Sequence, residues 1–390
     1  MPPCRLFASG VRPTFLLAGL AAVILIPEWV AVWVFGAPLA SRWPPTLWHA
    51  HEMAFGFVGA AIAGFLLTAV PSWTGRRGFG GAPLVLLVAL WLSGRLLVFS
   101  SARWPSTVVM AVDVGFFPAL ALLIAPPLVR ARNRNTPLLL VLALLTACNA
   151  AFHLVLVRQN PVAAGHIVLV AIDLVLLLLT VIGGRILPAF TASGLRQTGA
   201  AAQILSSPAL DRAAIGAMAL VGVVDLIWPD TAAAGAIAGL AAVFQAARLL
   251  QWRSAATLKQ PILWVLHLAY AWLPVGLALK SAALLGGFAA SAFWLHALTI
   301  GALATMILGV MTRAALGHTG RSLVVAPPIA VAYGLLLLAA LVRVFGLGVA
   351  HLDYVAVIVS SAGLWTAAFA LYLYVYVPIL WSPRVDAKAG

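Results

Sequence analysis

The chain consists of long apolar runs separated by short segments that contain glycine, proline and arginine. A helix needs about 20 apolar residues to cross the hydrocarbon core of a bilayer, and most of these runs reach that length. The pattern therefore predicts an all-α fold, a polytopic membrane protein with about 12 transmembrane helices. The predicted spans are 14–35, 47–72, 81–99, 106–129, 136–157, 161–183, 212–228, 231–252, 260–285, 291–312, 326–345 and 351–380.

Composition supports this prediction. Of the 390 residues, 64% are hydrophobic and only 8% are charged, which lies far outside the range of soluble globular proteins. The longest predicted loop, near 184–211, is too short for a soluble domain. We therefore expect residues 1–390 to form a single transmembrane domain.

Lysine and arginine are concentrated in alternate loops of this map. Cytoplasmic loops of membrane proteins collect these residues, and one set of loops holds most of the 23 in the chain. We therefore expect a multi-pass protein with both termini in the cytoplasm. The net charge of +14 reflects this topology rather than a basic patch, so membrane lipid is an expected partner and nucleic acid is not. The opposite set of loops holds only Arg42, Arg103, Arg158 and Arg343.

Six of the eight histidines fall at predicted helix ends on the side opposite the basic loops. A ring of imidazoles at one depth suggests a metal or haem site, because imidazole is a common ligand of both. His351 precedes Asp353 in a loop and is better explained as a solvated end residue. The six residues are His49, His51, His153, His166, His296 and His351.

The motif Trp48-His49-Ala50-His51-Glu52 places two histidines one residue apart. On a helix their side chains point roughly 200° apart, so they cannot bind one ion together. They can border two different sites, or one can bind a metal while the other forms a hydrogen bond. Glu52 enters the membrane edge, where ionisable side chains are costly and usually functional. The alternative is an interfacial belt of Trp and His at the headgroup level.

The other histidines of the ring differ in their neighbours. His153 follows Asn149 by one helical turn, which suits either a ligand with a supporting amide or a helix-end cap. His166 shares a helix face with Asp173, as in carboxylates that orient metal-bound imidazoles. His296 lies in an apolar helix without a charged neighbour and is the strongest single candidate. For the second site beside His49, the nearest expected partners are His153 and His166.

Two cations, Arg95 and Lys280, lie within predicted spans. They can bind the propionates of a haem, or they can extend to the nearby interface without a ligand. We expect cofactor-binding residues to be His51, His296, His49, His153 and Arg95. The expected metal ligands are His49, His51, His153, His166 and His296.

Two further polar segments lie on the basic side of the map. The segment Gly183-Gly184-Arg185-Ile186-Leu187-Pro188 is expected to end the sixth span, because glycines followed by proline form a helix stop. His267 lies within the ninth span, where a hydrogen bond between packed helices is a better explanation than a polar relay. His318 is explained by a loop cap.

Three stretches of the chain resemble one another, since each begins with a histidine outside and ends with a threonine inside. They run from His51 to Thr74, from His166 to Thr191, and from His296 to Thr319. This similarity predicts three repeats of four helices around a pseudo-threefold axis, or else it is a coincidence. The predicted repeats are 1–130, 131–258 and 259–390.

Four motifs follow one another along the chain. They are Trp48-His49-Ala50-His51-Glu52-Met53, Gly183-Gly184-Arg185-Ile186-Leu187-Pro188-Ala189-Phe190-Thr191, His296-Ala297-Leu298-Thr299-Ile300-Gly301-Ala302 and Met311-Thr312-Arg313-Ala314-Ala315-Leu316-Gly317-His318-Thr319-Gly320-Arg321. They resemble the motifs of the NnrS family of haem- and copper-containing membrane proteins involved in the response to nitric oxide, and the resemblance covers essentially the whole chain. It implies haem b and copper as cofactors, nitric oxide or another small gas as ligand, and a bacterial inner membrane.

The chain is similar more loosely to the catalytic subunit of haem-copper oxidases and nitric oxide reductases, which also has twelve helices in three sets. It departs from that subunit because its two closely spaced histidines lie on the second helix and no adjacent His-His pair exists. A membrane nitric oxide or oxygen reductase therefore stays an alternative. It needs a proton route, for which Glu28, Glu52, Asp113 and Asp173 are the obvious carriers. A secondary transporter is the alternative from a different class.

Overall fold

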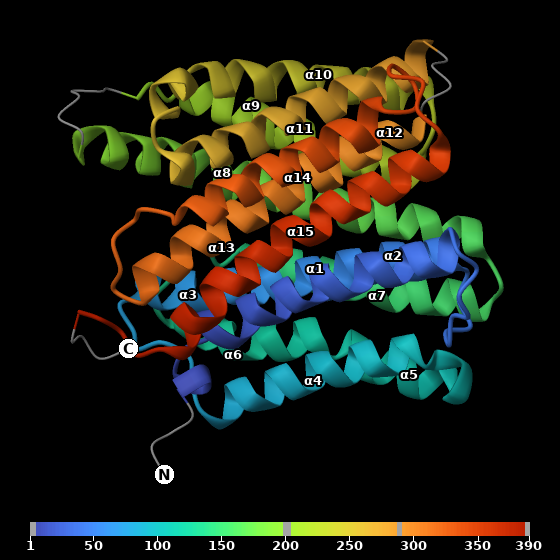
Figure 1. Ribbon diagram of the computed structural model, residues 1–390, viewed down its shortest axis with the longest axis horizontal. Coiled ribbons are helices and arrows are strands. Elements are labelled where there is room, and N and C mark those ends of the chain that lie inside the picture. The colour runs from blue at the N-terminus through green and yellow to red at the C-terminus, as the bar shows by residue number, and fades with distance from the viewer. Residues whose placement is uncertain (1–4, 198–203, 287–290, 387–390) are drawn as a thin grey trace. The chain divides into compact units, whose positions relative to one another are not determined.

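The computed structural model describes residues 5–197, 204–286 and 291–386 (Figure 1). Within these ranges the regular structure is helical and contains no strand. Eleven helices in the described residues are long and apolar enough to cross a membrane. The predicted all-α fold of a multi-pass membrane protein is therefore confirmed.

The first of two compact units comprises Met1–Ala171, Met311–Leu323 and Phe369–Gly390. In this unit α1 packs against α3, α4 against α5, and α6 against α7 (Figure 1). The helices of its first segment are η1 (Arg5–Ala8), α1 (Val11–Trp33), α2 (Pro45–His51), the π-helix η2 (Glu52–Phe57), α3 (Val58–Thr74), α4 (Ala82–Phe99), η3 (Ser101–Arg103), α5 (Ser106–Val114), α6 (Phe116–Arg130) and α7 (Leu138–Val157).

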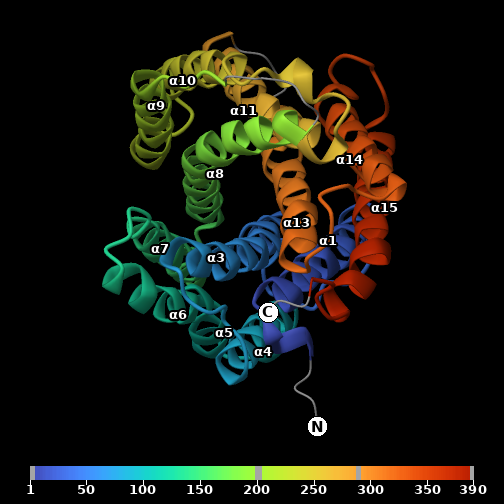
Figure 2. The same ribbon diagram turned by 90° about the vertical axis from the view of Figure 1, so that its left-hand side faces the viewer.

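The second unit comprises Ile172–Val310 and Val324–Ala368. Here α10 lies between α9 and α11 (Figure 2), and η5 packs against α11. Three of the four unit boundaries fall within α8 (Pro161–Gln197), α13 (Thr305–His318) and α15 (Tyr354–Trp381), and the fourth lies in the loop that follows α13. That the chain forms one domain of three repeats stays a prediction. The other helices are α9 (Pro208–Ile227), α10 (Ala232–Leu250), η4 (Ser254–Thr257), α11 (Pro261–Gly286), α12 (Ser291–His296), the π-helix η5 (Ala297–Ala304) and α14 (Pro327–Phe345).

The predicted helix stop at residues 183–188 is wrong, because α8 continues through both glycines and Pro188 to Gln197. Gly184 serves a close approach instead of a turn. A Cβ atom at this position would collide with the guanidinium of Arg248, which donates a 2.7 Å hydrogen bond to the carbonyl oxygen of Thr180. Proline inside a membrane helix is tolerated where neighbouring groups satisfy the backbone.

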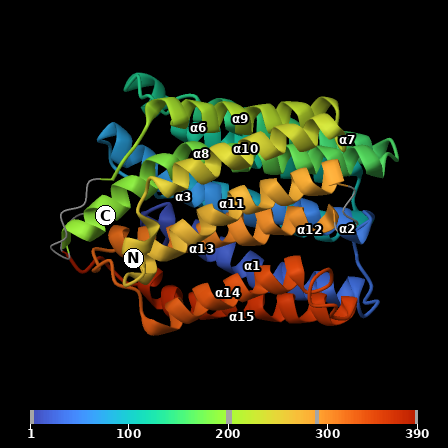
Figure 3. The same ribbon diagram turned by 90° about the horizontal axis from the view of Figure 1, so that it is seen from above.

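Helix α9 corresponds to the predicted span 212–228. It is 20 residues long and lies along α10 (Figure 3), but it carries Asp211, Arg212 and Asp225 and is not one of the eleven helices that are long and apolar enough to cross a membrane. The two ends of the chain are in contact in the first unit. Nη1 of Arg12, in α1, donates a 2.6 Å hydrogen bond to the carbonyl oxygen of Leu380, in α15. The start of α1 therefore lies beside the end of α15. This contact favours an even number of crossings, with α9 as the twelfth.

Candidate metal centre

His51 is the last residue of α2, and the π-helix η2 begins directly after it. Together with α3 these segments form one span of 30 residues, Pro45–Thr74. A π-helical turn inserts one extra residue, which changes the direction of the side chains around it and leaves backbone groups free for other partners. The carbonyl oxygen of Gly56, inside η2, accepts a 3.1 Å hydrogen bond from Nε1 of Trp91. Such segments occur frequently at functional sites.

The imidazole of His51 is fully buried and interacts through both ring nitrogens. Nδ1 lies 3.1 Å from Oε1 of Glu52. Nε2 lies 3.0 Å from Oδ1 of Asn149 and 3.1 Å from Oδ2 of Asp113. A carboxylate on one ring nitrogen is the arrangement that orients a histidine whose other nitrogen binds a metal.

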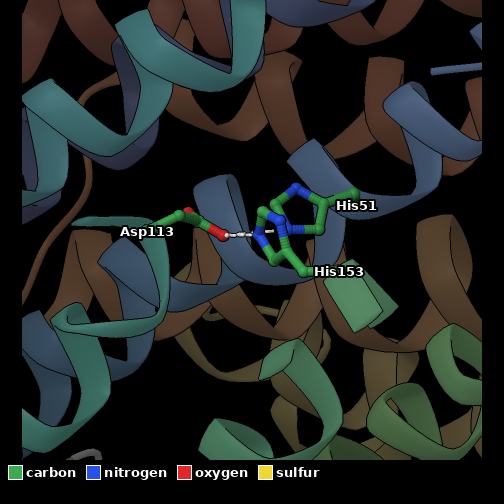
Figure 4. A group of neighbouring side chains, drawn as sticks. All are labelled: His51, Asp113 and His153. Carbon is green, nitrogen blue, oxygen red and sulfur yellow. Dashed lines mark hydrogen bonds and ion pairs between the residues drawn. The ribbon is translucent and has the colours of Figure 1, made fainter. Parts of the chain in front are cut away.

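Asp113, on α5, is the centre of this group. Its Oδ2 atom lies 2.9 Å from Nε2 of His153, on α7 (Figure 4). The same oxygen accepts a 2.9 Å hydrogen bond from Nδ2 of Asn149, which is also on α7. Its Oδ1 atom accepts from Arg95. Three potential ligand atoms, one each from His51, Asp113 and His153, lie within 4.8 Å of one another. The three residues are at most 4% exposed.

Arg95, on α4, joins the two carboxylates of the group. Its Nη1 donates a 2.6 Å hydrogen bond to Oε1 of Glu52, and its Nη2 donates to Asp113. Gly56 makes room for it, since a Cβ atom at this position would lie 3.1 Å from Nη1. With both imidazoles neutral, two carboxylates face a single guanidinium. The remaining negative charge is costly in an apolar interior, and a bound cation would compensate it.

The donor chemistry fits a metal. Two imidazoles and one carboxylate form a set that iron, copper and zinc accept. Aromatic rings enclose the group, with the ring centroid of Trp43 4.9 Å from that of His51 and 5.1 Å from that of His153. A cavity of about 330 Å³, lined by Arg42, Trp43 and His153 among others, adjoins it. A small molecule in this cavity therefore reaches His153 directly.

Comparison with known proteins identifies the family. The model of the NnrS protein family matches residues 5–384, nearly the whole chain. The chain belongs to the NnrS family. No curated protein matches it.

In this NnrS-family protein, the three other candidate ligands of the ring lie outside the His51–Asp113–His153 group. His49 is half-buried, and its ring stacks on Trp29 at 4.5 Å between centroids. His166 is half-buried on α8 and belongs to the first unit. His296 ends α12 in the second unit and is followed directly by the π-helix η5, as His51 is followed by η2. The structure thus brings His153 to His51 rather than to His49.

The remaining histidines have structural surroundings. His267 lies between Oγ1 of Thr191, at 2.7 Å, and Oγ of Ser254, at 2.9 Å, which is the hydrogen bond between packed helices that its position predicts. His318 ends α13 and is exposed, and His351 is exposed in a loop. All three lie outside the metal-capable group.

The sequence does not single out Asp113 as a potential ligand in this NnrS-family protein. Asp113 stands far from any histidine in the sequence and is expected only as a proton carrier. One signal does point to it, since this aspartate and Arg95 occur in neighbouring apolar spans. Buried charges in membrane helices are almost always paired, and that rule predicts an Arg95–Asp113 contact.

Proposed function

We propose that this NnrS-family protein binds haem b and copper in a bacterial inner membrane and acts in the response to nitric oxide, with both termini in the cytoplasm. Family membership supports this function. The single structural observation that carries it is the convergence of His51, Asp113 and His153 in a buried group. We place the metals near the periplasmic face, because the sequence predicts that these histidines lie on the side opposite the basic loops.

Copper is the metal proposed for this group. Imidazole nitrogen and carboxylate oxygen suit Cu(II), whereas Cu(I) prefers the sulfur ligands that the group lacks. The three ligand atoms lie within 4.8 Å of one another, so a single ion can bind all three. His51 is therefore assigned to the copper rather than to the haem. Glu52 holds its ring in place, and Arg95 offsets part of the carboxylate charge.

Haem b is proposed at the other histidines. His296 is the first candidate for an axial ligand because it shares with His51 the position just before a π-helix. His49 and His166 are half-buried and supply the alternatives. Arg95, which could pair with a propionate, is bonded to Glu52 and Asp113 and is assigned to the copper group.

The cavity beside His153 supports a small uncharged ligand such as nitric oxide. It is lined by apolar side chains, such as Val109 and Leu156, together with the polar residues Arg42 and Ser106. Arg42 is held by hydrogen bonds to Ser106 and to the carbonyl oxygens of Ser101 and Trp104. Each of the three guanidinium nitrogens of Arg42 thus donates one hydrogen bond to the protein, which favours a gas over an anion as the ligand.

Metal analysis and visible absorption of the purified full-length protein test this proposal. The wild type should contain copper and show the Soret band of a b-type haem. His153→Ala should lose copper and keep the haem spectrum, and His296→Ala should do the reverse. His318→Ala is the matched control, because this exposed histidine lies outside the group. If His153→Ala kept its full copper content, the assignment of copper to the His51–Asp113–His153 group would be refuted. If the purified wild type contained no haem, the proposal that the protein binds haem would be refuted.

A further inference from the structure

Three buried charged side chains meet in the second unit, from three different helices. Asp173 of α8 is 3% exposed, and Asp225 of α9 and Lys280 of α11 are each 1% exposed. Nζ of Lys280 donates to Oδ2 of Asp225. The same ammonium lies 4.8 Å from the ring centroid of Trp294, so it is held between a carboxylate and an aromatic face.

The second carboxyl group, Asp173, has no ammonium of its own. Asp225 and Lys280 are the charged groups that act on it, and its side chain is within hydrogen-bonding reach of Asp225. Oδ2 of Asp173 and Oδ1 of Asp225 are buried and have no hydrogen-bond partner in the part of the chain that the structure describes. One buried group therefore contains two carboxyl oxygens that accept no hydrogen bond from the described residues.

The charge count of the group requires one more positive charge. Two ionised carboxylates and one ammonium leave a net negative charge, and burying such a charge is expensive. An ionised carboxylate only accepts hydrogen bonds, whereas a protonated carboxyl also donates one. A proton shared by Asp173 and Asp225 satisfies both needs, since it neutralises the group and supplies the missing donor.

We propose that Asp173, Asp225 and Lys280 form a proton-binding site that holds one exchangeable proton between the two carboxyl groups. The site lies in the second unit and does not depend on the metals proposed above. Release of the proton leaves a buried negative charge, so it must accompany the entry of water or a cation. Buried ionisable groups of this kind form the proton relays of membrane pumps and transporters.

Infrared spectroscopy of the full-length protein tests the proposal, because a protonated carboxyl shows a C=O stretch that an ionised one lacks and that shifts in deuterated water. The wild type should show this band at neutral pH. Asp173→Asn and Asp225→Asn should each lose it, because a single remaining carboxylate balances Lys280 without a proton. Asp353→Asn, a change at an exposed helix cap, is the control and should keep the band.

Two results would overturn the proposal. The first is a wild-type spectrum that lacks the band, or that equals the spectra of Asp173→Asn and Asp225→Asn in this region. The second is a melting temperature of the wild type that rises with sodium chloride but not with choline chloride, while the melting temperature of Asp173→Asn does not rise with sodium chloride. Such a result would mean that the group holds a sodium ion instead of a proton. Two variants are used so that one remains informative if the other does not fold.

Discussion

The guanidinium of Arg95 bonds to Asp113, the same carboxylate that approaches His51 and His153. Asp113, which contacts both histidines, is thus already paired with a cation of the protein, Arg95. Arg95 and a metal ion therefore act on the same carboxylate. The protein is expected to keep the group folded without metal, at the cost of some metal affinity.

Replacement of Arg95 by methionine should destabilise the metal-free protein by about 3–5 kcal/mol, because Glu52 and Asp113 are left without a buried counter-charge. A divalent metal should reverse much of this loss, since it supplies the missing charge. Thermal unfolding with and without Cu²⁺ measures both effects. Arg103→Met is the matched control, because Arg103 is exposed. An equal loss of stability with and without the metal would contradict the charge argument.

Asn149 contacts both sides of the group without being a histidine or a carboxylate. It donates to Asp113 at 2.9 Å and lies 3.0 Å from Nε2 of His51. Asn149→Ala should weaken metal binding by about 10–100-fold, the effect typical of residues that orient ligands. Competition with a chelator of known affinity measures the change. Asn160→Ala, at an exposed helix start, should leave the affinity unchanged.

Gly184 is expected to be indispensable for packing in the second unit. The guanidinium of Arg248 occupies the space of its missing Cβ atom and also bonds to Asp211 and Tyr270. Gly184→Ala should therefore destabilise the protein by about 1–3 kcal/mol, the typical cost of overpacking.

Gly216 of α9 offers the matched control for this substitution. A Cβ atom there meets no atom within 4 Å. Gly216→Ala should raise stability slightly, by about 0.5–1 kcal/mol, because alanine is the better helix former. Thermal unfolding of both variants in one detergent gives the comparison. Equal effects at the two positions would show that Arg248 moves aside readily.

The sequence predicted the existence of the helices well because apolar runs of sufficient length have few alternatives to a membrane span. It predicted His51, His153 and Arg95 as site candidates for a similar reason, since polar groups in such runs are costly. It did not predict which of them meet. Membrane helices are apolar toward both lipid and protein, so the pattern does not reveal which face of α5 carries Asp113 inward.

Local sequence signals are misleading where tertiary contacts decide whether a helix continues. Two glycines and Pro188 indicate a helix end, but in α8 one glycine accommodates Arg248, which is 64 positions further along the chain. The π-helices after His51 and His296 have no sequence rule of their own. Their common position after a histidine nevertheless agrees with the similarity that the sequence shows between these two stretches.

The contact between Arg12 and Leu380 leads to a prediction about topology. Because it joins the start of α1 to the end of α15, reporter fusions at the two ends of the chain should both lie on the same side of the membrane. That result requires α9 to cross the membrane despite Asp211, Arg212 and Asp225. Two of these charges are offset inside the protein, since Asp211 pairs with Arg248 and Asp225 with Lys280.

Fusions on either side of α9 decide whether it crosses. Fusions after Arg134 and after Arg253 should both report the cytoplasm, and fusions near Arg42, Arg103 and Asp230 should report the opposite side. If α9 instead lies outside the membrane, the fusion after Arg253 reports the periplasm while that after Arg134 does not change. In that case the chain has eleven crossings, and the two termini lie on opposite sides. The Arg12–Leu380 contact would then be impossible in the membrane, so this outcome would also refute the packing of α1 against the end of α15.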